Sequence, residues 1–165
     1  PKGREIGFGR SIRLTGPGRQ HAMYAGKFDV FNAPTVHLDE VATLPPDATV
    51  LATNAMSAVQ AAEIRTNGSV AWAVQYHPEY PLRELATIVR RIGAELVEEG
   101  FFVDETDLKR FAADLDLLDR DPGCKRLSWR HGISSNVLDK KLRVSELANW
   151  LQFQVLPQRV KRGRG

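Results

Sequence analysis

The alternation of apolar and polar residues predicts β-strands in the first half of the chain. In residues 70–76 (VAWAVQY) large apolar side chains alternate with small or polar ones, which is typical of a strand with one buried face. Residues 4–15 and 49–53 carry similar apolar patterns, and glycines in the former predict a bulge or close backbone approach near Gly9. Residues 59–64 are joined to 70–76 through an Asn-Gly turn, which predicts an antiparallel hairpin.

After residue 80 the apolar residues recur every three or four positions, which is typical of amphipathic helices. The pattern predicts four helices: 81–99, beginning at Pro81 and ending at Gly100, 105–119 with Asp104 as N-cap, a short one that holds Cys124, and 139–155. The expected fold class is therefore α/β, with strands and hairpins first and helices afterwards. No internal repeat or low-complexity linker is present, so we expect one domain with a helical C-terminal extension.

Two residues suited to acid–base chemistry follow the strand at 70–76. Pro78 lacks a backbone N–H and keeps the preceding residue, His77, out of the helical region. In an extended backbone, residues two apart project to the same side, so His77 and Glu79 are expected to meet. A carboxylate beside an imidazole fixes its tautomer and stabilises the imidazolium, as in the base and orienting members of a nucleophilic triad. The pair itself contains no nucleophile.

These residues belong to the run AVQYHPEY, which resembles the GVQYHPEY or GVQFHPE run that closes the active site of class I glutamine amidotransferases. Near the start, GREIGFGRSIRL resembles the strand after the nucleophile region, especially in stand-alone members similar to the glutaminase part of GMP synthase. The intervening TVHLDEVATLPPDATVLATNAMSAVQAAEI resembles the segment with the His-x-Asp of the loop beside the glutamine pocket, here His37 and Asp39. The resemblance covers residues 3 to about 95.

The resemblance implies a flavodoxin-like α/β parent fold, of which this chain would hold the second half. The expected domains are residues 1–100 as the C-terminal half of the amidotransferase domain, 101–156 as the helical extension and 157–165 as a basic disordered tail. The first residue is a proline rather than a methionine, so we expect the true beginning of the chain to be missing.

The resemblance also implies a chemistry. In the family a cysteine thiolate attacks the side-chain amide of glutamine, and the enzyme delivers ammonia. Carried over to this sequence, His77 takes the role of base and acid and Glu79 that of the orienting carboxylate. His37 and Asp39 are the expected substrate-binding residues, and the alternative is that they are satisfied within their own turn.

The nucleophile has no counterpart in this reading. The single thiol, Cys124, follows the His-Pro-Glu motif and is not preceded by a strand, so we expect a structural role for it. The leading hypothesis is therefore a truncated amidotransferase without its nucleophile. A second is a non-catalytic half-domain that acts as a binding or interaction module. A third makes Cys124 the nucleophile, because Lys125 and Arg126 would favour a thiolate.

Composition and charge narrow the partners. The chain has a net charge of +3, and the last seven residues alone contain four basic side chains. The rest of the chain is therefore nearly neutral and lacks the basic surface that binds nucleic acid, so no such partner is expected. No apolar run is long enough for a membrane span, and one cysteine fits a reducing cytoplasm. The histidines lack metal-ligand spacing and no phosphate-binding loop is visible, so neither metal nor cofactor is expected. Glutamine is the expected substrate. The expected protein partner is either a missing N-terminal half or a second copy of the chain, bound through an exposed sheet edge.

Overall fold

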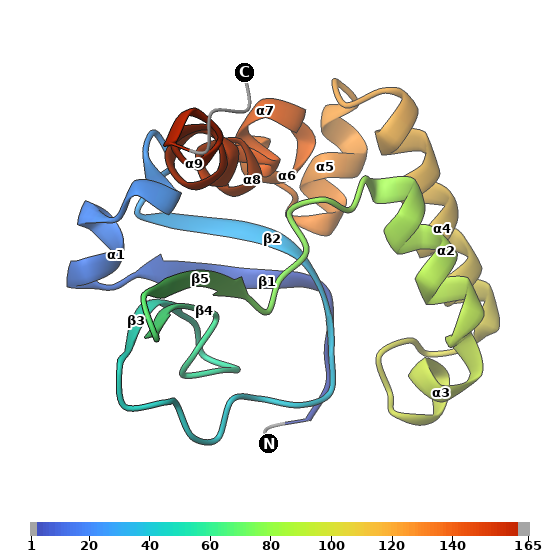
Figure 1. Cartoon of the computed structure of the whole chain (residues 1–165). Helices are drawn as coiled ribbons and strands as arrows, with labels where there is room; N and C mark the ends of the chain where they lie inside the picture. The colour runs from blue at the N-terminus through green and yellow to red at the C-terminus, as the bar shows by residue number, and fades with distance from the viewer. Residues whose placement is uncertain (1–2, 162–165) are drawn as a thin grey trace. The chain divides into compact units, whose positions relative to one another are not determined.

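The computed structural model describes the backbone of residues 3–161 and the side chains of residues 3–158. Its strands are β1 (Glu5–Leu14), β2 (Val30–His37), β3 (Ala48–Thr53), β4 (Ala61–Thr66) and β5 (Ser69–Val74). They form a sheet in the order β2-β1-β3-β4-β5, in which every neighbouring pair is antiparallel (Figure 1). Apart from two short helical segments between β1 and β2, the helices follow the strands along the chain, so the α/β class and the general order of its elements are confirmed.

Two short helical segments, α1 (Gly16–Gln20) and η1 (Ala22–Tyr24), lie between the first two strands. The later helices are α2 (Leu82–Arg91), α3 (Gly93–Glu98), α4 (Glu105–Arg120), α5 (Lys125–His131), α6 (Ser135–Leu138), α7 (Lys140–Arg143), α8 (Ser145–Trp150), the π-helical η2 (Leu151–Val155) and α9 (Leu156–Lys161). The predicted helix at 81–99 is thus two helices that meet at Ile92. The predicted helix at 139–155 begins as the separate α7 and continues beyond residue 155.

The chain forms two compact units: residues up to Glu79 together with those from Lys141 onward, and residues 80–140. The predicted boundary at residue 100 rests on family resemblance and stays a prediction about the family domain. The predicted disordered tail needs a correction, because α9 continues the helix through Lys161. Extending an existing helix costs far less than starting one, so polar residues can join its end. Residues 162–165 of that tail lie outside the described residues.

In the unit formed by residues 80–140, α2 packs against α4. At the start of α3, Gly93 lies close to α4: a Cβ there would come within 2.9 Å of Leu108 Cδ1. The predicted cap of α4 is confirmed, since Asp104 Oδ1 accepts a 2.8 Å hydrogen bond from the Asp107 N–H. Ion pairs between Arg83 and Asp119 and between Arg90 and Asp116 join the exposed sides of α2 and α4.

In the other unit, the predicted bulge of the first strand is confirmed. The register of β1 against β2 shifts between Gly9 and Ile12, and Ser11 has a φ of 48°. A Cβ on Gly9 would lie 2.7 Å from Thr35 Cγ2, which is the predicted close approach. The predicted hairpin is also confirmed: β4 and β5 pair in register across a turn in which Asn67 and the next glycine have positive φ.

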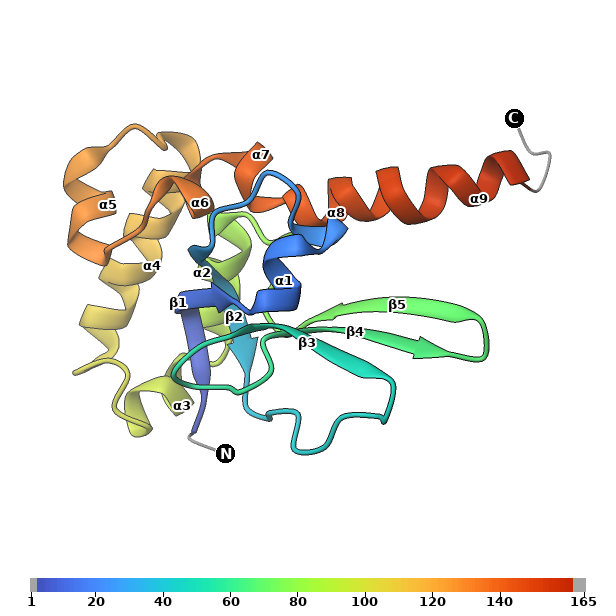
Figure 2. The same ribbon diagram turned by 90° about the vertical axis from the view of Figure 1, so that its left-hand side faces the viewer.

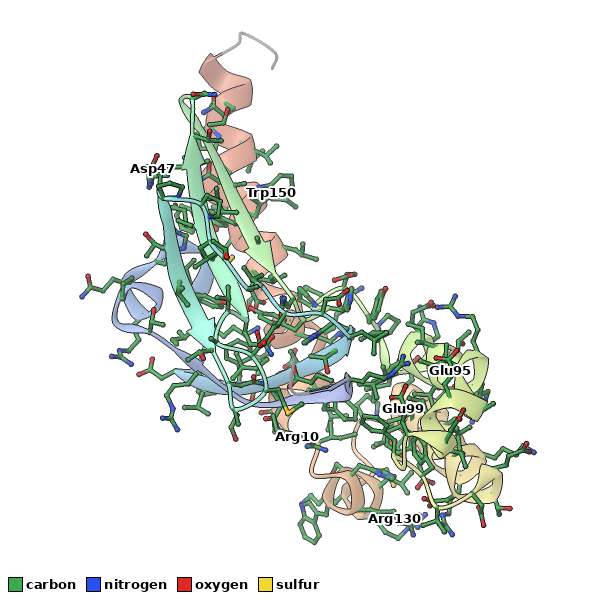
Figure 3. All side chains as sticks on the ribbon, turned by 90° about the horizontal axis from the view of Figure 1, so that it is seen from below. Arg10, Asp47, Glu95, Glu99, Arg130 and Trp150 are labelled. Carbon is green, nitrogen blue, oxygen red and sulfur yellow. The ribbon has the colours of Figure 1, made fainter. Side chains whose placement is uncertain are left out.

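The C-terminal helices of this unit run in one line from α8 to α9 (Figure 2). Helix α8 packs against η1, and Asn149 Nδ2 donates to the backbone oxygens of Met23 and Ala25 at 2.9 and 3.0 Å. The labelled Trp150 lies on α8 toward the hairpin (Figure 3), where it and Trp72 line an apolar groove of about 250 Å³. Among the described residues, no helix is both long and apolar enough to cross a bilayer.

Candidate functional site

The site is built where the continuation of β5 reaches the opposite edge strand. β5 ends at Val74, and Tyr76 then forms a bridge with Thr35 of β2. The backbone N–H of the next residue, His77, donates to the Pro34 oxygen at 2.7 Å. The chain just beyond β5 therefore meets β2, the strand at the other end of the sheet order, which fixes the backbone from which the His77 side chain projects.

The structure brings His77 and Glu79 together, as their spacing around Pro78 predicts. Nδ1 of His77 lies 2.8 Å from Oε1 of Glu79. Because a carboxylate can only accept here, Nδ1 carries the proton, and Nε2 is the nitrogen suited to exchange a proton with a substrate.

Pairing with a carboxylate does not by itself distinguish His77, since all four histidines of the chain contact one. His21 pairs with Glu63, His37 with Glu5 and His131 with Asp114, at 2.8 to 2.9 Å. What distinguishes the His77 pair is access: its imidazole is 29% exposed and its carboxylate 49%, whereas the other imidazoles are 13 to 16% exposed. A side chain that exchanges protons with a substrate needs that access, and a buried structural histidine does not.

The contact between His37 and Asp39 involves the backbone of Asp39 rather than its carboxylate. His37 Nδ1 lies 3.0 Å from the Asp39 carbonyl oxygen, and Nε2 lies 2.9 Å from Glu5 Oε2. Since Pro34 holds His77 and lies three residues before His37, the two histidines attach to β2 roughly 10 Å apart, at about 3.3 Å per residue.

Sequence reasoning missed the cluster that holds His37. Glu5 is 6% exposed, and its carboxylate accepts from Asn54 Nδ2 at 2.6 Å and from Gln60 Nε2 at 2.7 Å as well as from His37. Three donors around one buried carboxylate offset the cost of removing it from water. The only signal in the sequence is a charged residue at the start of an apolar strand, which identifies none of its partners.

A second buried network lies behind Tyr76. The Tyr76 hydroxyl donates to Glu146 Oε1 at 2.7 Å, so the Tyr24 hydroxyl, 2.9 Å away, must donate to Tyr76. Lys27 Nζ lies 2.6 Å from the same carboxylate and 4.5 Å above the Phe31 ring. The side chains of Lys27 and Glu146 are 4% and 3% exposed, so this is a buried ion pair. It ties α8 to the strand end beside His77.

Burial governs protonation in this network. It raises the pKa of the Tyr76 hydroxyl well above its usual value, and the nearby Glu146 carboxylate raises it further. Burial likewise raises the pKa of Tyr24. It lowers the pKa of Lys27, and the attraction of Glu146 opposes that shift. Both hydroxyls therefore keep their protons at neutral pH and remain hydrogen-bond donors.

Cys124 lies at the start of a helix. It precedes α5, and its backbone oxygen accepts from the N–H groups of Leu127 and Ser128. It belongs to the unit of residues 80–140, whereas His77 belongs to the other unit. Within the part of the chain that the structure describes, no three His, Cys, Asp or Glu side chains gather in a way that could hold a metal ion.

Comparison with known proteins adds a family to this geometry. The family model for glutamine amidotransferase class-I matches residues 5–96, which is more than half of the chain. The chain belongs to the class I glutamine amidotransferases. This family uses glutamine as a substrate, and residues 5–96 of the chain contain the whole sheet and the His77 turn.

Two relatives are similar beyond that segment. A gamma-glutamyl-L-1-hydroxyisopropylamide hydrolase from Pseudomonas sp is 30% identical over 155 residues, which cover 93% of this chain and 52% of the hydrolase. The crystal structure of SMU.1228c matches with a TM-score of 0.50 and 21% identity, over 77% of this chain and 53% of that one. The latter likeness concerns the fold alone. The chain thus spans about half the length of both relatives, and amide hydrolysis is the chemistry that family and hydrolase share.

Proposed function

We propose that the chain carries the acid–base half of a γ-glutamyl amide hydrolase site, with His77 as base and acid and Glu79 as its orienting residue. The observation that carries the proposal is the 2.8 Å contact between Nδ1 and the carboxylate, exposed to solvent at a backbone turn fixed by Pro34. With Nδ1 protonated, Nε2 takes the proton of an attacking thiol and then gives it to the leaving nitrogen.

The proposed reaction has two steps. A thiolate attacks the γ-carbonyl carbon of the substrate, the C–N bond breaks, and the nitrogen leaves as ammonia or an amine with the proton from His77. Water then attacks the resulting thioester and gives its proton to His77, which releases glutamate and regenerates the thiol. Glu79 stabilises the imidazolium that forms in each step.

The nucleophile in this proposal comes from outside these 165 residues. Cys124 is the single thiol of the chain, and its place at the start of α5 is accounted for by the backbone bonds that begin this helix. By itself the chain should therefore hydrolyse glutamine slower by several orders of magnitude than a complete enzyme, since loss of a triad nucleophile typically costs on the order of 10⁶ in turnover.

The test joins this chain to the portion of the Pseudomonas hydrolase that it does not match, and measures glutamate release from glutamine and from an N-alkylated γ-glutamyl amide. We expect activity in the joined protein, little in the chain alone, and loss of activity in His77→Gln. Equal activity in the joined protein with and without His77→Gln would contradict the role of His77. Full activity of the chain alone would contradict the external nucleophile.

The same assay addresses the substrate and His37. Preference for glutamine over the N-alkylated amide would favour the subtype similar to the glutaminase part of GMP synthase, and the reverse preference would favour the substrate class in the hydrolase's name.

We further propose that His37 and Asp39 shape the substrate pocket. His37→Gln should then raise KM more than it lowers kcat, and an unchanged KM would assign His37 to the Glu5 cluster alone.

A second candidate function is a non-catalytic module that pairs with a second copy of the chain. The observation that favours it is that β5 ends the sheet order, while the nearby α8–α9 helices carry exposed apolar side chains: Leu147, Trp150, Leu151, Phe153 and Leu156, each 41 to 51% exposed. Two copies of an edge strand can pair antiparallel around a two-fold axis. Sedimentation should show a discrete dimer that Ala71→Lys abolishes, whereas a monomer or a heterogeneous aggregate would exclude this interface.

A further inference from the structure

The C-terminal helices lie outside the matched family segment yet contact the functional turn. The family model ends at residue 96, while residues from Lys141 onward belong to the same compact unit as the sheet. Their deepest contact is Glu146, whose carboxylate is held by the Tyr76 hydroxyl and by Lys27. Tyr76 is the residue directly before His77.

Tyr76 is fixed from three sides. Its backbone bridges Thr35, its ring packs edge-on against Phe31 with centroids 5.5 Å apart, and its hydroxyl bonds to Tyr24 and Glu146. It is 1% exposed. Hydrogen bonds are directional and apolar contacts are not, so the two hydroxyl bonds fix the position of the Tyr76 ring within its apolar surroundings.

We propose that Glu146 is a positioning residue for the His77 turn and acts through the Tyr76 hydroxyl. This inference rests on the proposed function, in which His77 exchanges protons with the substrate. The carboxylate holds the Tyr76 side chain in place, the Tyr76 backbone holds the His77 N–H against the Pro34 oxygen, and the His77 ring thereby stays within reach of Glu79. The C-terminal helices are thus part of the site's framework.

A tautomer measurement tests this without any enzymatic assay. In the ¹⁵N-labelled 165-residue chain, the ring nitrogens of His77 report how much of the neutral imidazole is protonated at Nδ1. Tyr76→Phe removes one hydroxyl and keeps the ring, so the sheet should fold. We expect the Nδ1–H share of His77 to fall and its ring resonances to shift, while those of His37 and His131, which have their own carboxylate partners, stay in place.

Two more variants separate positioning from general loosening of the C-terminal helices. Glu146→Leu removes the acceptor of the Tyr76 hydroxyl bond and should move the His77 resonances in the same direction. Asn149→Ala removes the two hydrogen bonds from this α8 side chain to Met23 and Ala25 and leaves Tyr76 and Glu146 untouched, so it should leave the His77 resonances unchanged.

The outcomes are distinct from those of the functional proposal. Unchanged His77 resonances in Tyr76→Phe would overturn the positioning role, and so would an equal shift in Asn149→Ala. In the joined protein described above, a positioning role predicts that Tyr76→Phe lowers kcat roughly tenfold with KM nearly unchanged, because a misoriented base weakens proton transfer rather than binding. If His77→Gln stays active there, the functional proposal fails whatever the tautomer measurement shows.

Discussion

The buried ion pair between Lys27 and Glu146 gives a sharp test of how the C-terminal helices are attached. The change is Lys27→Met, which keeps an unbranched apolar side chain, one heavy atom shorter than lysine, and removes the charge. In the structure Nζ lies 2.6 and 2.7 Å from the two carboxylate oxygens. Without it, Glu146 stays buried with only hydroxyl donors, from Tyr76 and Ser145.

The expected magnitude follows from burial. At 2.6 Å the attraction of two unit charges is about 6 kcal/mol for an effective dielectric constant of about 20, and desolvation offsets much of it. What remains after the change is an uncompensated buried carboxylate, for which the usual cost is about 3–5 kcal/mol. Lys27→Met with Glu146→Gln removes both charges and leaves an amide oxygen for Tyr76, so most of the lost stability should return.

The assay is urea unfolding followed by tryptophan fluorescence. Trp129 lies in the unit of residues 80–140 and is 78% exposed, so Trp129→Phe removes its signal at little cost. Trp72 and Trp150 then report the unit that contains the ion pair. The matched control is Lys109→Met, which breaks the exposed pair with Glu105 and should leave unfolding unchanged by circular dichroism.

Two results would refute the reasoning. If Lys27→Met unfolds within about 1 kcal/mol of the parent, the carboxylate is not buried as the structure has it, since a buried unpaired charge costs more. If the double variant is as unstable as Lys27→Met alone, the loss comes from packing of the Lys27 side chain rather than from charge.

Three further predictions concern single positions. Burial raises the pKa of Glu63, but hydrogen bonds from His21 and Arg65 lower it by more, so the folded protein has the lower pKa. The stability that the charged carboxylate contributes is therefore lost as the pH falls below about 4. Glu63→Gln should flatten the fall in melting temperature on acidification, and an unchanged profile would contradict this. Gly18→Ala places a Cβ 1.9 Å from the Leu51 backbone oxygen and should cost at least about 2 kcal/mol in urea unfolding, whereas a near-neutral effect would refute that close approach. Asp104→Ala removes the cap bond to the Asp107 N–H and should lower the stability of α4 by about 1 kcal/mol, with Asp104→Asn as the control that keeps an acceptor.

Much of the fold near the site could be predicted because its determinants are local. Strand alternation and an Asn-Gly turn specify the β4–β5 hairpin, and the steric effect of Pro78 on its neighbour places His77 and Glu79 on one side. The helix break at Ile92 was not predictable from the periodicity, because the apolar positions continue through Ile92 and Leu96 as they would in one helix.

The sequence by itself determined four of the five strands, the family resemblance and the His77–Glu79 pair, since each depends on residues at most a few positions apart. Only the tertiary structure decided that His37 is held by Glu5, 32 residues away, and that Tyr76 is held by Glu146, 70 residues away. Such pairs depend on strand order, register and the return of the chain to the sheet. A buried charge must find a partner, but the sequence does not specify which of many charged residues will be within reach.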